Sequence, residues 1–178
     1  WGSIIVRTQI AGELNNVRVR YGGREPVNPQ NCVPNVRRGL LTFEGPSTPG
    51  QRFILRSAIV EYALQDGIRI NPPSGSFAPV NVDIVQSFIT SSGGDACGGR
   101  DIFFNPYGGD GVSINGGDVR IVQVSSVSNR QRGINAQNST QLQIDAVLIE
   151  NNRSHGVLIS GSRPTIVDTQ HNPSFPHI

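Results

Sequence analysis

Short apolar segments of one form recur along the chain. Each begins on an apolar residue and usually has apolar residues at its fourth and sixth positions, followed by a polar or aromatic residue at its eighth; the last copy is incomplete. The copies begin at Leu14, Leu55, Ile84, Ile121, Ile144 and Ile166. The last three starts are 23 and 22 residues apart, so the undisturbed pattern has a period of about 22 residues.

A second short apolar segment opens on a glycine after most copies. These glycines are Gly39, Gly67, Gly111, Gly133 and Gly156, and Gly2 opens a similar segment before the first copy. Apolar and polar residues alternate in "GIRIN" and "GVSIN", as they do in a strand with one buried face. Glycine and asparagine at the corners tolerate a left-handed backbone, and stacked asparagines can hydrogen-bond to one another. The alternation predicts that Ile68, Ile70, Val112 and Ile114 point inward.

The repeat unit holds two short strands and has no room for a helix. Such a unit predicts a parallel β-helix, in which each strand pairs with its equivalent one rung away. A βαβ arrangement is excluded because no amphipathic segment of about ten residues separates the strands. We therefore expect an all-β solenoid of about six rungs, with loop insertions, as a single domain over residues 1–178. Its core should contain columns such as Ile68-Val112-Ile134-Val157.

The repeat resembles that of a known family. The segment from Gly111 to Asp168 and the opening "WGSIIV … LNNVRVRYGG" resemble the right-handed β-helix repeat of the pectate-lyase-like superfamily, including secreted bacterial surface proteins. The resemblance implies a right-handed coil. It leaves the function open, since the superfamily holds lyases, hydrolases, epimerases, tailspikes and adhesins. The "NTD…DD…GHG…RIK" series of polygalacturonases and the "DPH" element of alginate epimerases are missing.

Composition narrows the functional classes. Aromatic residues make up only 6% of the chain, so the core must consist mainly of Val, Ile and Leu. The net charge is +2 and all 15 basic residues are scattered arginines, which argues against a nucleic-acid surface. No apolar run is long enough to predict a membrane span. Because the chain opens on Trp1 within a patterned segment, we interpret it as a mature product or part of a longer solenoid.

Four insertions interrupt the repeat, at Gly23–Arg38, Gly45–Arg52, Pro72–Pro79 and Ser92–Asp110. Cys32 lies in the first insertion and Cys97 in the last, at the same corner two rungs apart. Rungs stack at about 4.8 Å, so loops from these two places can approach within the roughly 7 Å that a disulfide requires. We predict a Cys32–Cys97 bond, with two free buried thiols as the alternative. A disulfide would indicate an extracellular, cell-surface or periplasmic location.

Residues that precede the repeat glycines form a predicted outer column of Trp1, Arg38, Asp66, Asp110, Arg132 and His155. Asp66 and Asp110 fall on adjacent rungs, and arginines flank them. Paired carboxylates with arginines could bind Ca²⁺ and an acidic sugar, or could cleave a glycosidic bond. The simpler interpretation is ordinary Asp-Gly turn chemistry and a charge ladder that neutralises itself.

The other candidate residues carry less information. His155 has no partner motif and is expected to face solvent, while Tyr107 is a candidate for stacking on a sugar ring. No spacing typical of metal ligands appears, so we predict neither a resident metal nor a cofactor, and Ca²⁺ is the one ion considered.

These observations favour a non-enzymatic extracellular module, structural or adhesive, over an enzyme. In this hypothesis the β-helix associates through open ends, head to tail, into a filament, or binds polysaccharide, or does both. The alternative is a polysaccharide lyase or glycoside hydrolase fragment that uses Asp66 and Asp110, with Arg38 and Arg132 holding an acidic sugar. The outer positions of the glycine-initiated strands carry no carboxylate from Arg69 onward, which weighs against the alternative.

Overall fold

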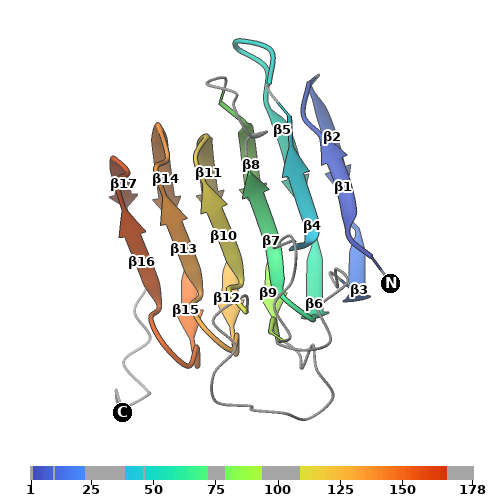
Figure 1. The fold of residues 1–178 in the computed structure, drawn as a ribbon, viewed down its shortest axis with the longest axis vertical. Helices are drawn as coiled ribbons and strands as arrows, with labels where there is room; N and C mark the ends of the chain where they lie inside the picture. Colours follow the sequence, from blue (N-terminus) through green and yellow to red (C-terminus); the bar gives the residue numbers. More distant parts are fainter. Residues whose placement is uncertain are drawn as a thin grey trace, which may run out of the picture.

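The structure is a computed structural model that describes residues 2–9, 11–22, 39–45, 47–71, 79–93 and 109–167. In this part of the chain all regular structure is β, and no helix is present, so no helix here could span a membrane. The strands wind into a parallel β-helix of six rungs (Figure 1). The predicted fold class is confirmed.

Three parallel sheets form the walls of the β-helix. In spatial order, sheet A contains β1 (Ile4–Arg7), β4 (Gly39–Glu44), β7 (Asp66–Asn71), β10 (Val112–Asn115), β13 (Ile134–Gln137) and β16 (Val157–Ser160). Sheet B contains β2 (Gly12–Asn15), β5 (Phe53–Arg56), β8 (Asn81–Val85), β11 (Asp118–Val122), β14 (Gln141–Asp145) and β17 (Pro164–Val167). Sheet C contains β3 (Arg18–Gly22), β6 (Ile59–Ala63), β9 (Phe88–Thr90), β12 (Ser125–Val127) and β15 (Leu148–Glu150).

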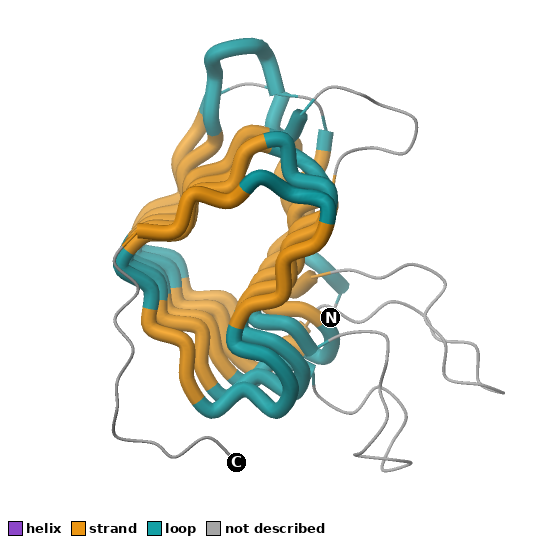
Figure 2. Tube along the Cα trace, turned by 90° about the vertical axis from the view of Figure 1, so that its left-hand side faces the viewer, coloured by secondary structure: helices purple, strands orange, loops and turns teal. Residues whose placement is uncertain are grey.

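Successive rungs stack in register, so that equivalent residues form columns. In sheet A, Val112 pairs with both Ile68 and Ile134, and Ile134 pairs with Val157, which confirms the predicted column. The first three of these residues are fully buried. Figure 2, a view along the axis of the β-helix, shows the strands of successive rungs stacked in three walls around the space that the core side chains fill. The core consists mainly of aliphatic columns of this kind.

Two columns of corner residues adopt the left-handed backbone conformation. One column joins sheet B to sheet C and contains Asn16, Ser57, Gln86, Gln123 and Ala146, with φ between 49° and 53°. The other follows sheet C and contains Tyr21, Tyr62, Ser91, Ser128 and Asn151, with φ between 53° and 57°. Because most of these residues are neither glycine nor asparagine, the repeat geometry and not the local residue imposes this conformation.

The repeat glycines serve a different purpose from the one expected. We expected glycine at the corners to supply a left-handed backbone, and this is wrong for Gly67, Gly111 and Gly133, which do not have positive φ. They are needed because the neighbouring rung leaves no room for a Cβ atom at these positions. A Cβ atom on Gly111 would lie 2.1 Å from the Ser126 side chain and 2.8 Å from the Gly133 carbonyl oxygen. Rungs therefore approach too closely at this corner for any side chain.

Asparagines also form the predicted ladder between rungs. The Asn152 side-chain oxygen accepts hydrogen bonds from the backbone N–H and the side-chain amide of Asn129, both at 2.9 Å. The Asn129 side-chain oxygen in turn accepts the backbone N–H of Ser92 at 3.1 Å. The asparagine pair at 151–152 thus combines a left-handed corner residue with a residue that connects rungs.

Candidate functional site

Asp66 begins β7 and was the first candidate catalytic residue. Its carboxylate is fully buried. Oδ1 accepts the backbone N–H groups of Gly109 and Asp110, each at 3.2 Å, and Oδ2 lies 3.2 Å from Nη1 of Arg69. Both oxygens therefore have partners within the protein.

Asp110, the second candidate, occupies the equivalent position on the next rung. Its Oδ1 accepts the backbone N–H of Arg132 at 3.2 Å, and its Oδ2 accepts a hydrogen bond from the side-chain amide of Asn135 at 2.8 Å. The Arg132 guanidinium lies 3.6 Å from the same oxygen. This carboxylate is also fully buried.

The predicted outer column is thus buried at its centre, which corrects the expectation of an exposed charge ladder. Each aspartate accepts the backbone N–H of the equivalent residue one rung further on, so the carboxylates act as connectors between rungs. An ionised carboxylate suits this position because it only accepts hydrogen bonds and the nearby groups donate them. Neither carboxylate is presented to solvent, where a substrate would meet it.

Replacement of Asp66 by asparagine is expected to destabilise the protein by about 1.5–3 kcal/mol, because it removes the charge from a buried hydrogen-bond network and puts an amide NH2 donor in place of one accepting oxygen. Asp145→Asn, a substitution on the outer face of sheet B, should change stability by less than about 0.5 kcal/mol. Urea denaturation followed by circular dichroism measures both values. Equal shifts in the two variants would contradict the structural role of Asp66.

Of the remaining predicted site residues, the structure describes Arg132 and His155, which precede the repeat glycines Gly133 and Gly156 on adjacent rungs. Arg132 is mostly buried and pairs with Asp110, whereas His155 is exposed as predicted and its Nδ1 lies 2.8 Å from the Ser154 hydroxyl. The other candidates, Arg38, Tyr107, Cys32 and Cys97, lie outside the described residues. Within the described ranges, no group of three or more His, Cys, Asp or Glu side chains could hold a metal ion.

A pair of stacked tyrosines, which the sequence analysis did not single out, lies at the corner after sheet C. The rings of Tyr21 and Tyr62 are parallel within 6°, with centroids 5.0 Å apart. They are 60% and 44% exposed. Both tyrosines hold the eighth position of the repeat in successive copies, and equivalent positions stack about one strand spacing apart. That shared position was the signal that could have predicted the stack.

Two arginines beside the tyrosines converge on one carboxylate. Nε of Arg18 lies 2.6 Å from Oε1 of Glu61, and Nε of Arg20 contacts the same oxygen. The Glu61 side chain is 8% exposed, while the arginine side chains are 52% and 41% exposed. The hydrogen bonds from Arg18 and then Arg20 hold the pKa of Glu61 below its ordinary value, against the opposing effect of burial.

This interaction has a defined pH dependence. Because the folded-state pKa of Glu61 is lowered, its contribution to stability is fully present above the unfolded-state pKa of about 4.3. The contribution is lost as the pH falls through the lowered folded-state pKa. The hydrogen bond to Glu61 also raises the pKa of Arg20, so Arg20 and Glu61 both stay ionised at neutral pH.

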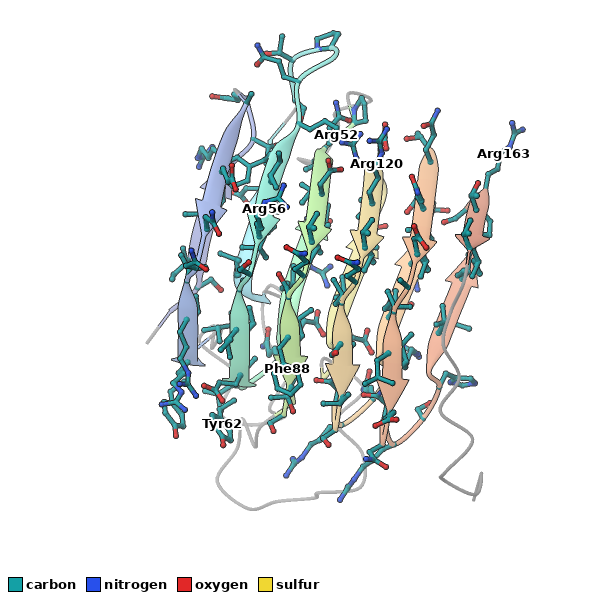
Figure 3. The ribbon with its side chains drawn as sticks, turned by 180° about the vertical axis from the view of Figure 1, so that it is seen from behind. Arg52, Arg56, Tyr62, Phe88, Arg120 and Arg163 are labelled. Carbon is teal, nitrogen blue, oxygen red and sulfur yellow. The ribbon has the colours of Figure 1, made fainter. Side chains whose placement is uncertain are left out.

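Apolar side chains extend this surface across the outer face of sheet C. Phe88 is 40% exposed and pairs in register with the partly buried Ile59 of the preceding rung. Figure 3 shows Tyr62 and Phe88 on the lower part of this view, away from the labelled arginines of sheet B and its corner. We define the aromatic–arginine patch as Arg18, Arg20, Tyr21, Ile59, Glu61, Tyr62 and Phe88.

Comparisons with known proteins assign no family to this surface or to the chain. No protein-family model, no curated protein and no solved structure matches it.

Proposed function

We propose that this protein is a non-enzymatic structural and adhesive module that works outside the cytoplasm. In this proposal its end rungs associate with a further rung, and its outer surface binds glycans. We also propose a relationship to the pectate-lyase-like superfamily, supported by the three-sheet parallel β-helix and by the repeat.

The observation that carries the proposal is the apolar surface on both outermost described rungs. Ile4 is 49% exposed, although its partner in the same column, Leu41, is 1% exposed. Ile166 is 51% exposed, although its partner Ile144 is fully buried. Inward positions of a β-helix are covered only by the next rung, so these rungs need a neighbour. The neighbour is either further chain of the same solenoid or a second copy stacked head to tail.

The burial of both aspartates supports the non-enzymatic choice. A glycosidase of the common type places two carboxyl groups on either side of the scissile bond, where the substrate can reach them. Asp66 and Asp110 are instead fully buried and hydrogen-bonded to the backbone of neighbouring rungs.

Head-to-tail association is tested by sedimentation and electron microscopy over a range of concentrations. We expect rods or fibres whose mass rises with concentration. Ile166→Asp should abolish their growth, because it places a charge on an apolar inward column. Thr165→Asp, on the outer side of the same strand, serves as the matched control and should leave growth unchanged. A wild-type protein that is monomeric at every concentration would refute the self-association.

The enzymatic alternative is tested separately. Acidic and neutral polysaccharides are incubated with the protein, with and without Ca²⁺, and are assayed for depolymerisation. We expect no turnover. Turnover that disappears in both Asp66→Asn and Asp110→Asn, at a temperature where both variants remain folded, would replace our proposal with the lyase or hydrolase.

Non-reducing peptide mapping is expected to show Cys32 joined to Cys97, which would support a location outside the cytoplasm. A bond that closes a loop of this length contributes about 2–4 kcal/mol to stability in the chain-entropy account. Reduction should therefore lower the denaturation midpoint of the wild type. Two thiols that react with an alkylating agent in the denatured, unreduced protein would contradict the prediction.

A further inference from the structure

We propose that the aromatic–arginine patch on sheet C binds a linear polysaccharide that carries carboxylate groups. This inference deepens the glycan-binding part of the proposed function and rests on it. It places the site on a different face from Asp66 and Asp110, and it assigns direct contacts to Tyr62, Arg18 and Arg20.

The first argument is the exposed aromatic surface. Tyr21, Tyr62 and Phe88 are each at least 40% exposed, although aromatic residues are scarce in this chain. All three lie on the first three rungs, in or just after strands of sheet C. Tyr21 and Tyr62 lie side by side, and Phe88 belongs to the next strand of the same sheet. Exposed rings grouped in this way indicate a recognition surface, whereas scattered single exposures would need no explanation.

Among the described residues, no ring stacks on the second face of Tyr62, which is 44% exposed. Its other face stacks on Tyr21, and the next residue in the same left-handed column is the much smaller Ser91. Ser128 follows one rung further and is exposed. A sugar ring lying over Ser91 would place its C–H face against the Tyr62 ring and its hydroxyl groups near the serine hydroxyls. A tyrosine suits such a contact because it offers a rigid apolar face and a polar tip.

The net charge of the patch favours a negatively charged ligand. Two arginines face a single glutamate, which leaves one net positive charge. Both arginines contact Glu61 through Nε, and no described residue provides a hydrogen-bond acceptor for their terminal nitrogens. These half-exposed forks remain able to bind a carboxylate in the bidentate manner that arginine favours. A ligand that bears carboxylates therefore fits this patch better than a neutral one.

The repetition of the surface favours a linear polymer over a small molecule. Equivalent side chains recur about every 4.8 Å along the stack of rungs. Beyond the aromatic–arginine patch, the same columns continue with the polar residues Ser125, Ser128 and Asn151. A polymer that lies along the axis would contact the rings and arginines of the first rungs and then the polar residues of the later rungs, whereas small ligands usually require a concave pocket.

Binding is measured by isothermal titration calorimetry with alginate, a polymer of uronic acids, in the absence of Ca²⁺. Two probes serve as controls, the neutral propylene glycol ester of alginate and poly-L-glutamate, an acidic polymer without sugar rings. The variants are Tyr62→Ser and Arg20→Ala within the patch and Arg120→Ala on sheet B. Serine is already the residue of this column on the next two rungs, so Tyr62→Ser should fold, and a urea denaturation curve checks this.

We expect alginate to bind and both patch variants to weaken binding at least about fivefold, as for truncated side chains at the centre of an interface. Arg120→Ala, which removes an exposed arginine elsewhere, should leave binding unchanged. If the neutral ester binds as tightly as alginate, carboxylates are not required and the inference is wrong. If poly-L-glutamate binds as tightly as alginate, the patch recognises negative charge and not sugar rings, which also overturns the inference. Absence of alginate binding would overturn this inference, while the sedimentation result would still decide the structural role independently.

Discussion

Gly111→Ala is expected to lower the free energy of unfolding by about 3 kcal/mol, near the upper end of the typical cost of overpacking. The new Cβ would lie 2.1 Å from the Ser126 side chain and 2.7 Å from the Asn129 amide nitrogen. It would also lie 2.8 Å from the Gly133 carbonyl oxygen, which cannot move without disturbing the next rung. Since the backbone at Gly111 is not left-handed, the cost comes from the lack of space.

The matched control is Gly156→Ala, the equivalent glycine two rungs further on. Among the described residues its Cβ would meet only Ile149, at 3.3 Å. The loss of backbone freedom in the unfolded chain favours the alanine variant by about 0.4–1 kcal/mol, so this change should be close to neutral. Urea midpoints with unchanged slopes measure both variants. Equal shifts would show that the two corners are packed alike, against the structure.

The fold could be predicted from the sequence because a β-helix converts a repeat into a spatial column. Once the 22-residue spacing is recognised, Ile68, Val112, Ile134 and Val157 must stack, and they do. The same reasoning predicted the asparagine ladder, because one equivalent position lies directly above another. Such predictions need only the alignment of residues between successive rungs, and the apolar pattern determines that alignment.

The environment of each column could not be predicted in the same way. Asp66 and Asp110 were placed correctly on adjacent rungs, but the register does not reveal that both side chains turn toward backbone N–H groups and are buried. The repeat glycines were likewise placed correctly and explained incorrectly, because the distance between rungs at that corner is a three-dimensional quantity. The tyrosine stack, in contrast, could have been predicted but was not. Tyr21 and Tyr62 hold equivalent positions of the repeat, and these positions had already been identified.

Arg52 illustrates a structural role inside a predicted insertion. Its Nε lies 2.6 Å from Oδ1 of Asp83, and its Nη1 lies 3.0 Å from Oδ2 of Asp118. Its Nη2 also donates to the carbonyl oxygens of Val82 and Asp118, at 3.3 and 3.2 Å. The side chain is 18% exposed. One guanidinium group therefore connects three successive rungs, near the start of strands β5, β8 and β11 of sheet B.

Arg52→Ala is expected to destabilise the protein by about 2–3 kcal/mol, somewhat less than the loss of one partner from a fully buried ion pair. The substitution would leave Asp83 and Asp118 as neighbouring carboxylates without their shared cation, and both are largely shielded from solvent. Arg52→Lys should recover only part of the loss, because an ammonium group cannot reproduce the planar fork that contacts both carboxylates.

Arg56→Ala provides the comparison, because it removes another arginine from the same strand region. Arg56 pairs with Glu13 at 3.2 Å, but both side chains are about 40% exposed, at 39% and 43%. An exposed pair of this kind contributes at most about 1 kcal/mol, and added salt should weaken it further. The Arg52→Ala effect should persist in salt because its partners are shielded from solvent. If the two variants lose equal stability, or if salt removes the difference between them, Arg52 is only a surface ion pair and does not connect the rungs.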